Sequence, residues 1–407
     1  MKLRYFGIIA LFILILAACG NNNDDRFTPP PLTREQFLED FDYLMDTLEA
    51  NFPYLDIIYR RNGVDMRELA EEIRERIMDE DFNIDYMPFW NMLRGGFFYH
   101  AWPVGHLWLV GYPEYRRQIE FIDDFFSPFD MSVIHYFGRR LEDPPQFARR
   151  VNPLSTSIIE EGRIAYIRVQ SLMDLRPDEQ RINNFYSQLG GFEHLIIDIR
   201  GNIGGGPQQF HTFIAAPLID GYLQTQFHHF FMDGYYSYNF HRGLEGELGG
   251  VNRIFDFNIE DIGSILPDAE LSPEVIEDLA LMDFYYIETI LVSRGVARRA
   301  PFDGKIWILV DEHIISAAMQ VAAFYKDVGF ATFVGEAGGG MPASNFGSVF
   351  FSLPNTTFIV RFDPNYFLDN TGRPLEYGFV PHYPNREGMD ALQTVIAMIE
   401  EGQWTLR

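Results

Sequence analysis

The sequence has little of three things: cysteine, lysine and positive charge overall. Cys19 is the single cysteine among 407 residues, so the chain cannot form an internal disulfide. Acidic residues outnumber basic ones by 58 to 32, and the net charge of −26 argues against binding to nucleic acid and against electrostatic docking on anionic lipid. The hydrophobic content of 47% nevertheless fits a packed protein, and the length predicts a main domain with an accessory one.

Several common ligand motifs are missing as well. The chain has no HExxH motif or comparable ligand spacing, and the adjacent His228 and His229 cannot both face one metal ion from a strand, because successive side chains alternate between faces. The glycine run Gly204 to Gly206 is not followed by the Lys-Ser/Thr of a P-loop, and the GxGxxG spacing of a dinucleotide fold is absent. We therefore expect no metal and no cofactor.

The first 18 residues have the pattern of an export signal. Lys2 and Arg4 precede an apolar run from Tyr5 to Leu16 that is too short to span a bilayer and ends in small residues. The sequence Leu-Ala-Ala-Cys resembles a bacterial lipobox, which implies that Cys19 is lipidated and is not a catalytic thiol. The expected location is the extracytoplasmic face of the bacterial cell membrane, with residues 19–32 as the lipidated cysteine and a disordered tether.

Two stretches carry most of the chemical information. Leu195 to Ile199 is an apolar, strand-like run that leads into the glycines, and Ile306 to Val310 is a second such run, followed by Ser316 and an alanine-rich helical pattern. A serine before a helix is commonly only a cap. The pairing instead predicts an acyl-transfer site, in which Ser316 is the nucleophile and the N–H groups of Ala317 and of the Gly204/Gly205 loop bind the oxyanion.

These residues resemble the tail-specific, or carboxy-terminal processing, serine proteases and their tricorn-like relatives. The resemblance covers roughly residues 160 to 385. Its strand motif is matched by Asp198, Arg200, Asn202, Gly204 and Gly205, and its nucleophile helix by Ser316 and Asp327. The end of the strand after that helix is matched by Val334-Gly335-Glu336, and the strand before the glycines by Gly162 to Leu172. It implies an α/β fold with a ClpP/crotonase-like core, a mixed β-sheet and flanking helices, preceded by a small N-terminal helical domain.

The sequence differs from this family at the position of the general base. The position of the family's catalytic lysine holds Met341, and the three lysines of the chain, Lys2, Lys305 and Lys326, are all too far along the sequence to replace it. Histidine is the expected substitute because its pKa lies near neutrality.

His106 in VGHLWLV resembles the histidine base of tricorn-like members, although a histidine in the aromatic core is the alternative. His313, only three residues before Ser316, ranks second. Glu376 in PLEYGFVPHYP resembles a family glutamate and would orient the base, although it could equally be a solvated carboxylate. Met319 and Asp327 are expected to be structural.

The expected domains are 33–104 (helical), 105–160 (connecting) and 161–403 (core). Thr33 and Gln36 form a capping-box pattern at the start of the first helix, and a second helix is expected from Val64 to Met78. The connecting segment is too short for a PDZ domain, so none is expected.

Tyr222 to Phe240 is rich in aromatic residues, which indicates a buried strand pair or a substrate-binding wall. Ile259 to Arg294 has the character of surface helices.

Together these features predict a cofactor-free serine peptidase, lipid-anchored outside the membrane, that hydrolyses peptide bonds of extracytoplasmic proteins or peptides. The alternative is a non-catalytic surface lipoprotein of the same fold that binds peptide or another ligand, which the missing lysine favours. An acyl hydrolase or transferase with the same catalytic parts also stays open. The sequence indicates neither a cleavage preference nor an oligomeric state.

Overall fold

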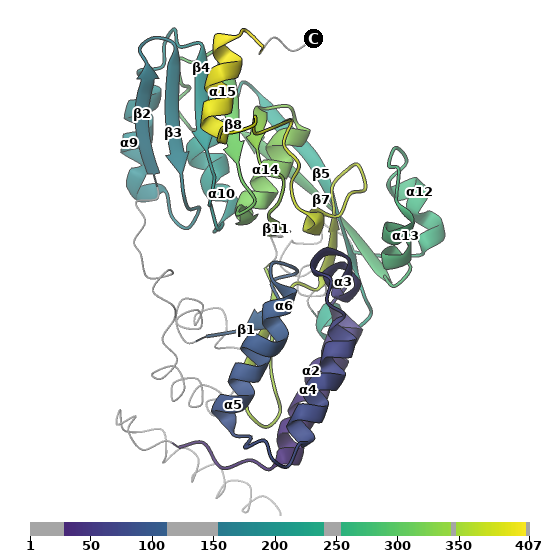
Figure 1. The fold of residues 1–407 in the computed structure, drawn as a ribbon. Coiled ribbons are helices and arrows are strands. Elements are labelled where there is room, and N and C mark those ends of the chain that lie inside the picture. The colour runs from purple at the N-terminus through teal and green to yellow at the C-terminus, as the bar shows by residue number, and fades with distance from the viewer. Residues whose placement is uncertain (1–27, 112–153, 240–253, 343–346, 404–407) are drawn as a thin grey trace, which may run out of the picture.

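The computed structural model describes residues 28–111, 154–239, 254–342 and 347–403. Figure 1 shows a sheet covered by helices at one end of the molecule and a helical part at the other, with the long strands β5 (Tyr222–Phe231) and β7 (Phe284–Ser293) between them. The expected export signal, Cys19 and residues 112–153 lie outside the described residues. The expected lipid anchor, the tether and the absence of a PDZ domain therefore stay predictions, as do the boundaries of the connecting segment.

A mixed sheet of six strands forms the centre of the core. Its order is β15 (Tyr383–Pro384), β10 (Thr332–Gly335), β8 (Lys305–Val310), β4 (His194–Asp198), β3 (Ile164–Val169) and β2 (Leu154–Glu160). All neighbours are parallel except β2, which is antiparallel to β3. The apolar runs predicted to be strands are β4 and β8, which lie side by side with His194 opposite Lys305.

Helices cover both faces of this sheet. Helix α15 (Ala391–Glu400) packs on one face through Ala391, Val395, Met398 and Ile399, against strand residues such as Ile196 and Trp307. Helices α9 (Glu179–Tyr186) and α14 (Ala317–Asp327) cover the other face. Only the last residues of α14 are not buried, because β11 (Gly340–Pro342) and the segment after Gly206 also pack against this helix. The expected α/β core with a mixed sheet and flanking helices is confirmed.

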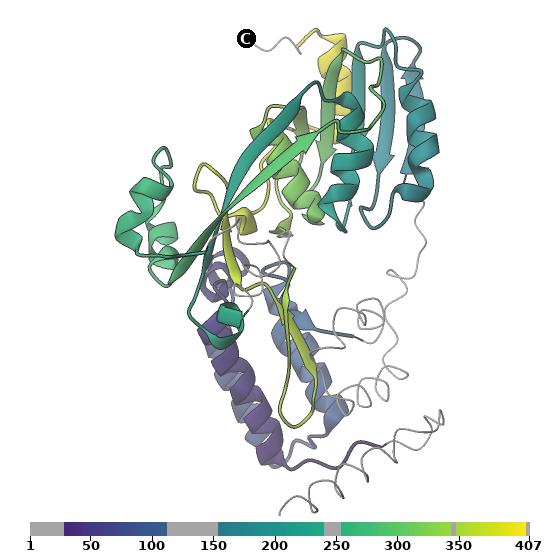
Figure 2. The same cartoon turned by 180° about the vertical axis from the view of Figure 1, so that it is seen from behind.

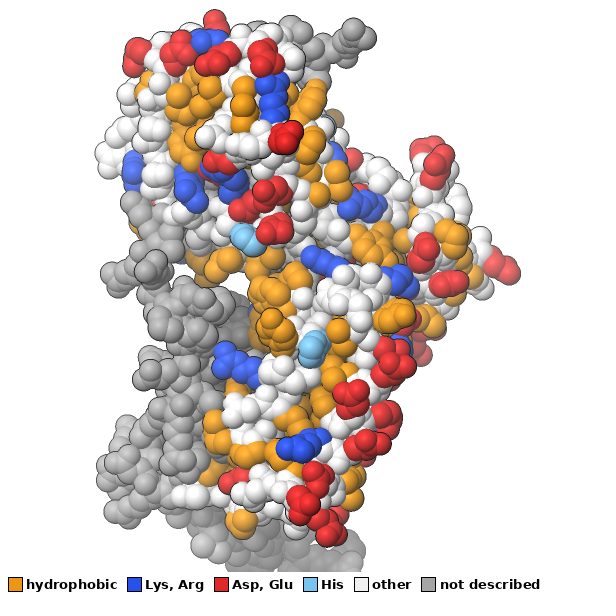
Figure 3. All heavy atoms as spheres, viewed as in Figure 1, with side chains coloured by type: hydrophobic (Ala, Val, Ile, Leu, Met, Phe, Trp, Pro, Cys, Tyr) orange, Lys and Arg blue, Asp and Glu red, His pale blue; other side chains and the backbone are white. Residues whose placement is uncertain are grey.

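The N-terminal part is helical and contains α2 (Arg34–Asn51), α3 (Leu55–Asn62), α4 (Met66–Met78), α5 (Tyr86–Asn91), the π-helix η2 (Met92–Phe98) and α6 (Tyr99–Ala101). Thr33 and Gln36 cap α2 reciprocally, as the capping-box pattern predicts. These helices share one apolar core with a three-stranded sheet, ordered β1 (Trp108–Leu109), β13 (Ile359–Phe362) and β12 (Val349–Ser352). Strands from late in the chain thus complete the N-terminal core. Figure 3 shows acidic side chains gathered on the outer side of this helical part.

A four-stranded antiparallel sheet connects the two ends of the molecule. Its order is β14 (Asn365–Leu368), β5 (Tyr222–Phe231), β7 (Phe284–Ser293) and β6 (Phe255–Asp256). Seen from behind, β5 and β7 run diagonally across the molecule (Figure 2). The expected buried strand in the aromatic segment is β5, but its partners come from β7 and β14 and not from the same segment.

The expectation of helices throughout residues 259–294 is wrong for its second half. Short helices occupy Ile259–Asp261 (η7), Ile262–Ile265 (α12) and Pro273–Leu279 (α13), after which β7 begins. Along β7, Glu288, Ile290 and Val292 are buried, whereas the residues between them are exposed. This alternation with period two is typical of a strand that has one face in the core.

Candidate active site

His106 and Asp363 meet because two strands pair in a particular register. β1 and β13 are antiparallel with Trp108 opposite Arg361, which places His106, two residues earlier, opposite Asp363, two residues later. The backbone N–H of Asp363 donates to the carbonyl of Gly105 at 2.7 Å, and Asp363 Oδ2 lies 2.5 Å from His106 Nδ1. Both side chains are buried. The pairing orients the imidazole and leaves Nε2 as its second functional atom.

Ser316 lies at the other ring nitrogen of this histidine. Its Oγ is 3.2 Å from His106 Nε2. The serine occupies the N-terminal end of α14 with φ 56° and ψ −129°, and its side chain does not cap the helix. A positive φ at a residue with a side chain is strained and is found mainly at functional sites. The plain-cap alternative for Ser316 is therefore wrong.

The glycine turn lies directly against this serine. A Cβ atom added to Gly204 would come within 2.7 Å of Ser316 Cβ and 2.9 Å of the Ala317 nitrogen, so only glycine allows the approach. The N–H of Gly204 already donates to Asn202 Oδ1 at 2.8 Å. Gly204 was expected to be one of the oxyanion donors, and this is incorrect because its N–H is occupied. Asn202 is a residue whose role the sequence did not indicate: it holds the turn by a bond to the Val169 carbonyl.

The remaining two expected donors are available. Leu172 pairs with the flanking residues of the glycine turn, since its N–H donates to the carbonyl of Gly204 and its carbonyl accepts from Gly206. The N–H of Gly205 consequently points to the opposite edge of this segment. Neither that group nor the N–H of Ala317 at the start of α14 donates to another described residue. Gly205 and Ala317 can thus both donate to an oxygen next to Ser316.

Glu376 does not contact the histidine, so its expected role as the group that orients His106 is incorrect. Its Oε1 accepts from the Gly105 N–H at 3.2 Å, and its Oε2 accepts from the Met341 N–H at 3.1 Å. Burial raises the pKa of Glu376 to about 8, with the nearby charge of Asp363 acting in the same direction and Arg61 against it. The β1–β13 register gives the place at His106 Nδ1 to Asp363 instead.

Two further residues hold the site together and were not indicated by the sequence. Ser348 Oγ donates to the second carboxylate oxygen of Asp363 at 2.5 Å. Arg61, at the end of α3, donates to the backbone carbonyls of Glu376 and Gly339, and more weakly to that of Pro103 at 3.4 Å. Burial lowers the pKa of Arg61. One side chain from the helical part therefore fastens two loops of the core beside the catalytic residues.

Comparison with known protein families identifies the family of the chain. Residues 163–384, more than half of the chain, match the model of peptidase family S41. The chain belongs to peptidase family S41. No curated protein sequence is similar enough to count as a match.

Two solved structures share this fold over nearly the whole S41 chain, and a third aligns less well. A candidate peptidase from Parabacteroides merdae aligns with a TM-score of 0.55 at 15% identity, covering 90% of this chain and 96% of that one. Mature CPAF aligns with a TM-score of 0.54 at 12% identity, covering 92% and 99%. The photosystem II D1 C-terminal processing protease is a more distant neighbour, with a TM-score of 0.39 at 13% identity and coverage of 90% and 97%. At these identities the likeness concerns the fold alone.

The position that holds the catalytic lysine in the S41 resemblance lies next to Ser316. β11 (Gly340–Pro342) runs parallel to β9 (Ile315–Ser316) with Pro342 opposite Ser316, and the buried Met341 is its neighbour. Neither of the two lysines in the described ranges takes its place: Lys326 Nζ donates to the Val380 carbonyl, and Lys305 Nζ lies over the ring of Trp307. The side chain that lies at Ser316 Oγ instead is His106, through Nε2 at 3.2 Å.

The other candidates from the sequence lie elsewhere. The side chain of His313 is 71% exposed and is nearest to Glu312, at 3.8 Å, so it does not contact Ser316. Asp327 accepts from Thr225 and Asn370 at the far end of α14, and Met319 is buried. Within the described ranges, no group of three or more His, Cys, Asp or Glu side chains could hold a metal ion. None of the helices in those ranges is long and apolar enough to cross a membrane.

Proposed function

We propose that this protein is a serine peptidase in which Ser316 is the nucleophile, His106 the general base and Asp363 the group that orients the base. The observation that carries the proposal is the line of contacts from Ser316 Oγ to His106 Nε2, at 3.2 Å, and from His106 Nδ1 to Asp363, at 2.5 Å. A serine hydroxyl needs such a base, because it is a poor nucleophile at neutral pH. The same three roles recur on unrelated folds, in any chain order.

The first half of the reaction follows from this geometry. Ser316 Oγ forms a bond to the carbonyl carbon of the peptide while its proton moves to His106 Nε2, and Asp363 stabilises the resulting imidazolium. The carbonyl oxygen becomes an oxyanion, which the N–H groups of Gly205 and Ala317 bind, assisted by the positive end of α14. The C–N bond then breaks, and His106 returns the proton to the leaving amine.

The second half uses the same groups with water. A water molecule gives its proton to His106 as its oxygen attacks the acyl group on Ser316. The ester bond breaks, the new carboxyl group leaves, and Ser316 Oγ takes the proton back from His106. Every proton is returned, so the cycle requires no cofactor.

We also propose that the protein acts outside the cytoplasm and is held at the membrane by a lipid on Cys19. The support is the lipobox-like sequence at residues 16–19, which lies outside the described residues. Protein or peptide substrates in that compartment are the expected partners. Metabolic labelling with an alkyne-bearing palmitate analogue tests the anchor: wild type should be labelled and a Cys19→Ser variant should not. Equal labelling of both would refute it.

Reaction of purified protein with a fluorophosphonate probe tests the catalytic proposal. Wild type should be labelled, whereas Ser316→Ala and His106→Ala should not. His313→Ala is a matched control, since this histidine is near Ser316 in sequence but exposed to solvent. Absence of labelling in folded wild type would instead favour the non-catalytic surface protein that the buried Met341 at the family's lysine position suggests.

A further inference from the structure

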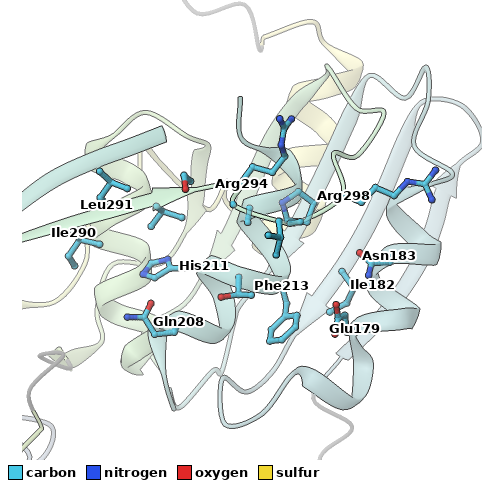
Figure 4. A pocket seen from close by; sticks show the side chains of 18 of the residues that line it. Glu179, Ile182, Asn183, Gln208, His211, Phe213, Ile290, Leu291, Arg294 and Arg298 are labelled. Atoms are coloured by element: carbon cyan, nitrogen blue, oxygen red, sulfur yellow. The ribbon is translucent and has the colours of Figure 1, made fainter. Parts of the chain in front are cut away.

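A hollow in the molecule lies apart from the proposed catalytic residues. Its volume is about 750 Å³. Its walls are α9, the segment from Gln208 to Pro217 that follows the glycine turn, and the end of β7 with the loop after it. Figure 4 shows side chains from all three walls around this space. Ser316, His106 and Asp363 are not among the residues that line it.

One wall of this cavity is an open sheet edge. On one side, β7 pairs with β5 along all ten of its residues. On its other side, β6 pairs only with Phe284 and Tyr285. Within the described part of the chain, Thr289 to Ser293 therefore have no strand on their second edge, and all five of these residues line the cavity.

Nothing in this stretch protects the edge. Proteins usually cover an edge strand or interrupt it with charges, proline or a bulge, because its free N–H and C=O groups pair with any extended chain. Thr289 to Ser293 reads TILVS, without charge or proline, and its pairing with β5 has no register shift. Leu291, 58% of whose surface is exposed, adds an apolar side chain next to these backbone groups.

Positive charge gathers where this edge ends. Arg294, Arg298 and Arg299 fall within six residues of a chain whose net charge is −26. Asp220 accepts from Arg299 at 2.7 Å and lies 3.6 Å from Arg294, and Glu179 lines the opposite wall. Arg298 has no carboxylate within ion-pair distance in the described ranges. In Figure 4 its guanidinium extends from the loop away from that of Arg294, toward the Asn183 side of the cavity.

We propose that this edge binds an extended, acidic segment of the protein substrate, which adds to β7 as a further strand and places a carboxylate near Arg298. The inference rests on the proposed peptidase function. Main-chain pairing at a sheet edge supplies affinity with little dependence on sequence. Arg294 faces Asp220, and Arg299 pairs with both Asp220 and Asp303, so Arg298 supplies the preference for acidic side chains. The wall segment begins with Gln208, three residues after Gly205, so the cavity at this edge is bordered by the element that leads out of the glycine turn.

The test uses the mature chain with Cys19→Ser, in an additional Ser316→Ala background so that no probe is cleaved. The probe is a short fluorescein-labelled peptide in which glutamate alternates with valine, and fluorescence anisotropy measures its affinity. Arg298→Ala should weaken binding about threefold, as expected for an exposed ion pair. Arg76→Ala, an exposed arginine on α4, is the matched control and should change nothing. N-methylation of alternate peptide residues, which removes the N–H groups of one edge, should weaken binding at least about tenfold.

Fluorophosphonate labelling of Ser316, in protein that retains this serine, separates the two proposals. Labelling together with equal affinity for the methylated and unmethylated peptides would overturn the edge site and leave the peptidase standing. Peptide binding without labelling would overturn the peptidase instead. Sedimentation velocity adds a third result: self-association that Leu291→Glu abolishes, with no peptide binding, would assign the edge to a second copy of the chain and overturn the substrate site.

Discussion

Replacing Glu376 by glutamine should change how the stability of the protein depends on pH. The carboxyl group is buried, and its pKa is raised to about 8 from an ordinary value of 4.5. Between these two values the folded protein binds a proton at Glu376 that the unfolded chain does not bind. The stability that this protonated group provides is complete below about pH 4.5 and is lost as the pH rises toward 8.

The size of the effect follows from the same two values. Each tenfold change in proton affinity corresponds to about 1.4 kcal/mol, so the free energy of unfolding should fall by at most roughly 5 kcal/mol between pH 4.5 and pH 8. Glutamine has no charge at any pH and removes this dependence. It also turns an NH₂ group toward one of the two N–H donors, of Gly105 and Met341, which costs roughly 1–3 kcal/mol at every pH.

Urea unfolding at a series of pH values from 5 to 9 measures both effects. Wild type should be more stable than Glu376→Gln at pH 5, and the difference should shrink or reverse by pH 9. Glu312→Gln is the matched control, because 63% of this side chain is exposed, and its curve should follow wild type. Parallel curves for wild type and Glu376→Gln across the whole range would refute the reasoning.

Three other substitutions test the site. Asp363→Asn should slow fluorophosphonate labelling of Ser316 by roughly a thousandfold or more, because His106 loses its orienting anion. The circular dichroism spectrum should stay unchanged. A labelling rate within tenfold of wild type would contradict the orienting role of Asp363. Gly204→Ala should abolish labelling, because the added Cβ atom would lie 2.7 Å from Ser316 Cβ. Urea unfolding should show a free energy of unfolding lower by about 1–3 kcal/mol. Normal labelling would show that the glycine turn can move away from Ser316. Arg61→Lys should lower the free energy of unfolding by about 2 kcal/mol, because one ammonium group cannot replace the hydrogen bonds of the guanidinium group to two separate carbonyls. An unchanged midpoint of urea unfolding would argue that Arg61 does not hold the two loops together.

The parts of the site that could be predicted from the sequence are determined by residues close to one another along the chain. The strand before Gly204 and the strand before Ser316 each carry their own apolar pattern and their own turn chemistry, so both could be placed without the rest of the fold. The capping box of α2 is equally local. The contact between the two strands is not local, but parallel strands that end in functional turns usually bring those turns to one edge of a sheet.

The parts that escaped prediction depend on pairing between distant segments. Asp363 lies 257 residues from His106, and only the β1–β13 register brings them together. Nothing in the sequence around Asp363 distinguishes it from other carboxylates. β7 carried a usable signal in the alternation of Tyr286, Ile290 and Val292, but the buried Glu288 interrupts the apolar series and made the segment resemble a polar surface helix.

The order in which the catalytic residues occur along the chain bears on the cell that makes this protein. His106 leaves the ribosome 210 residues before Ser316, and Asp363 follows later still. At typical rates of synthesis, roughly 10 to 50 seconds separate the first member of the group from the last. With the proposed catalytic roles, a nascent chain that already contains the histidine has no activated serine, and the proposed peptidase chemistry is withheld from its surroundings until synthesis is almost complete.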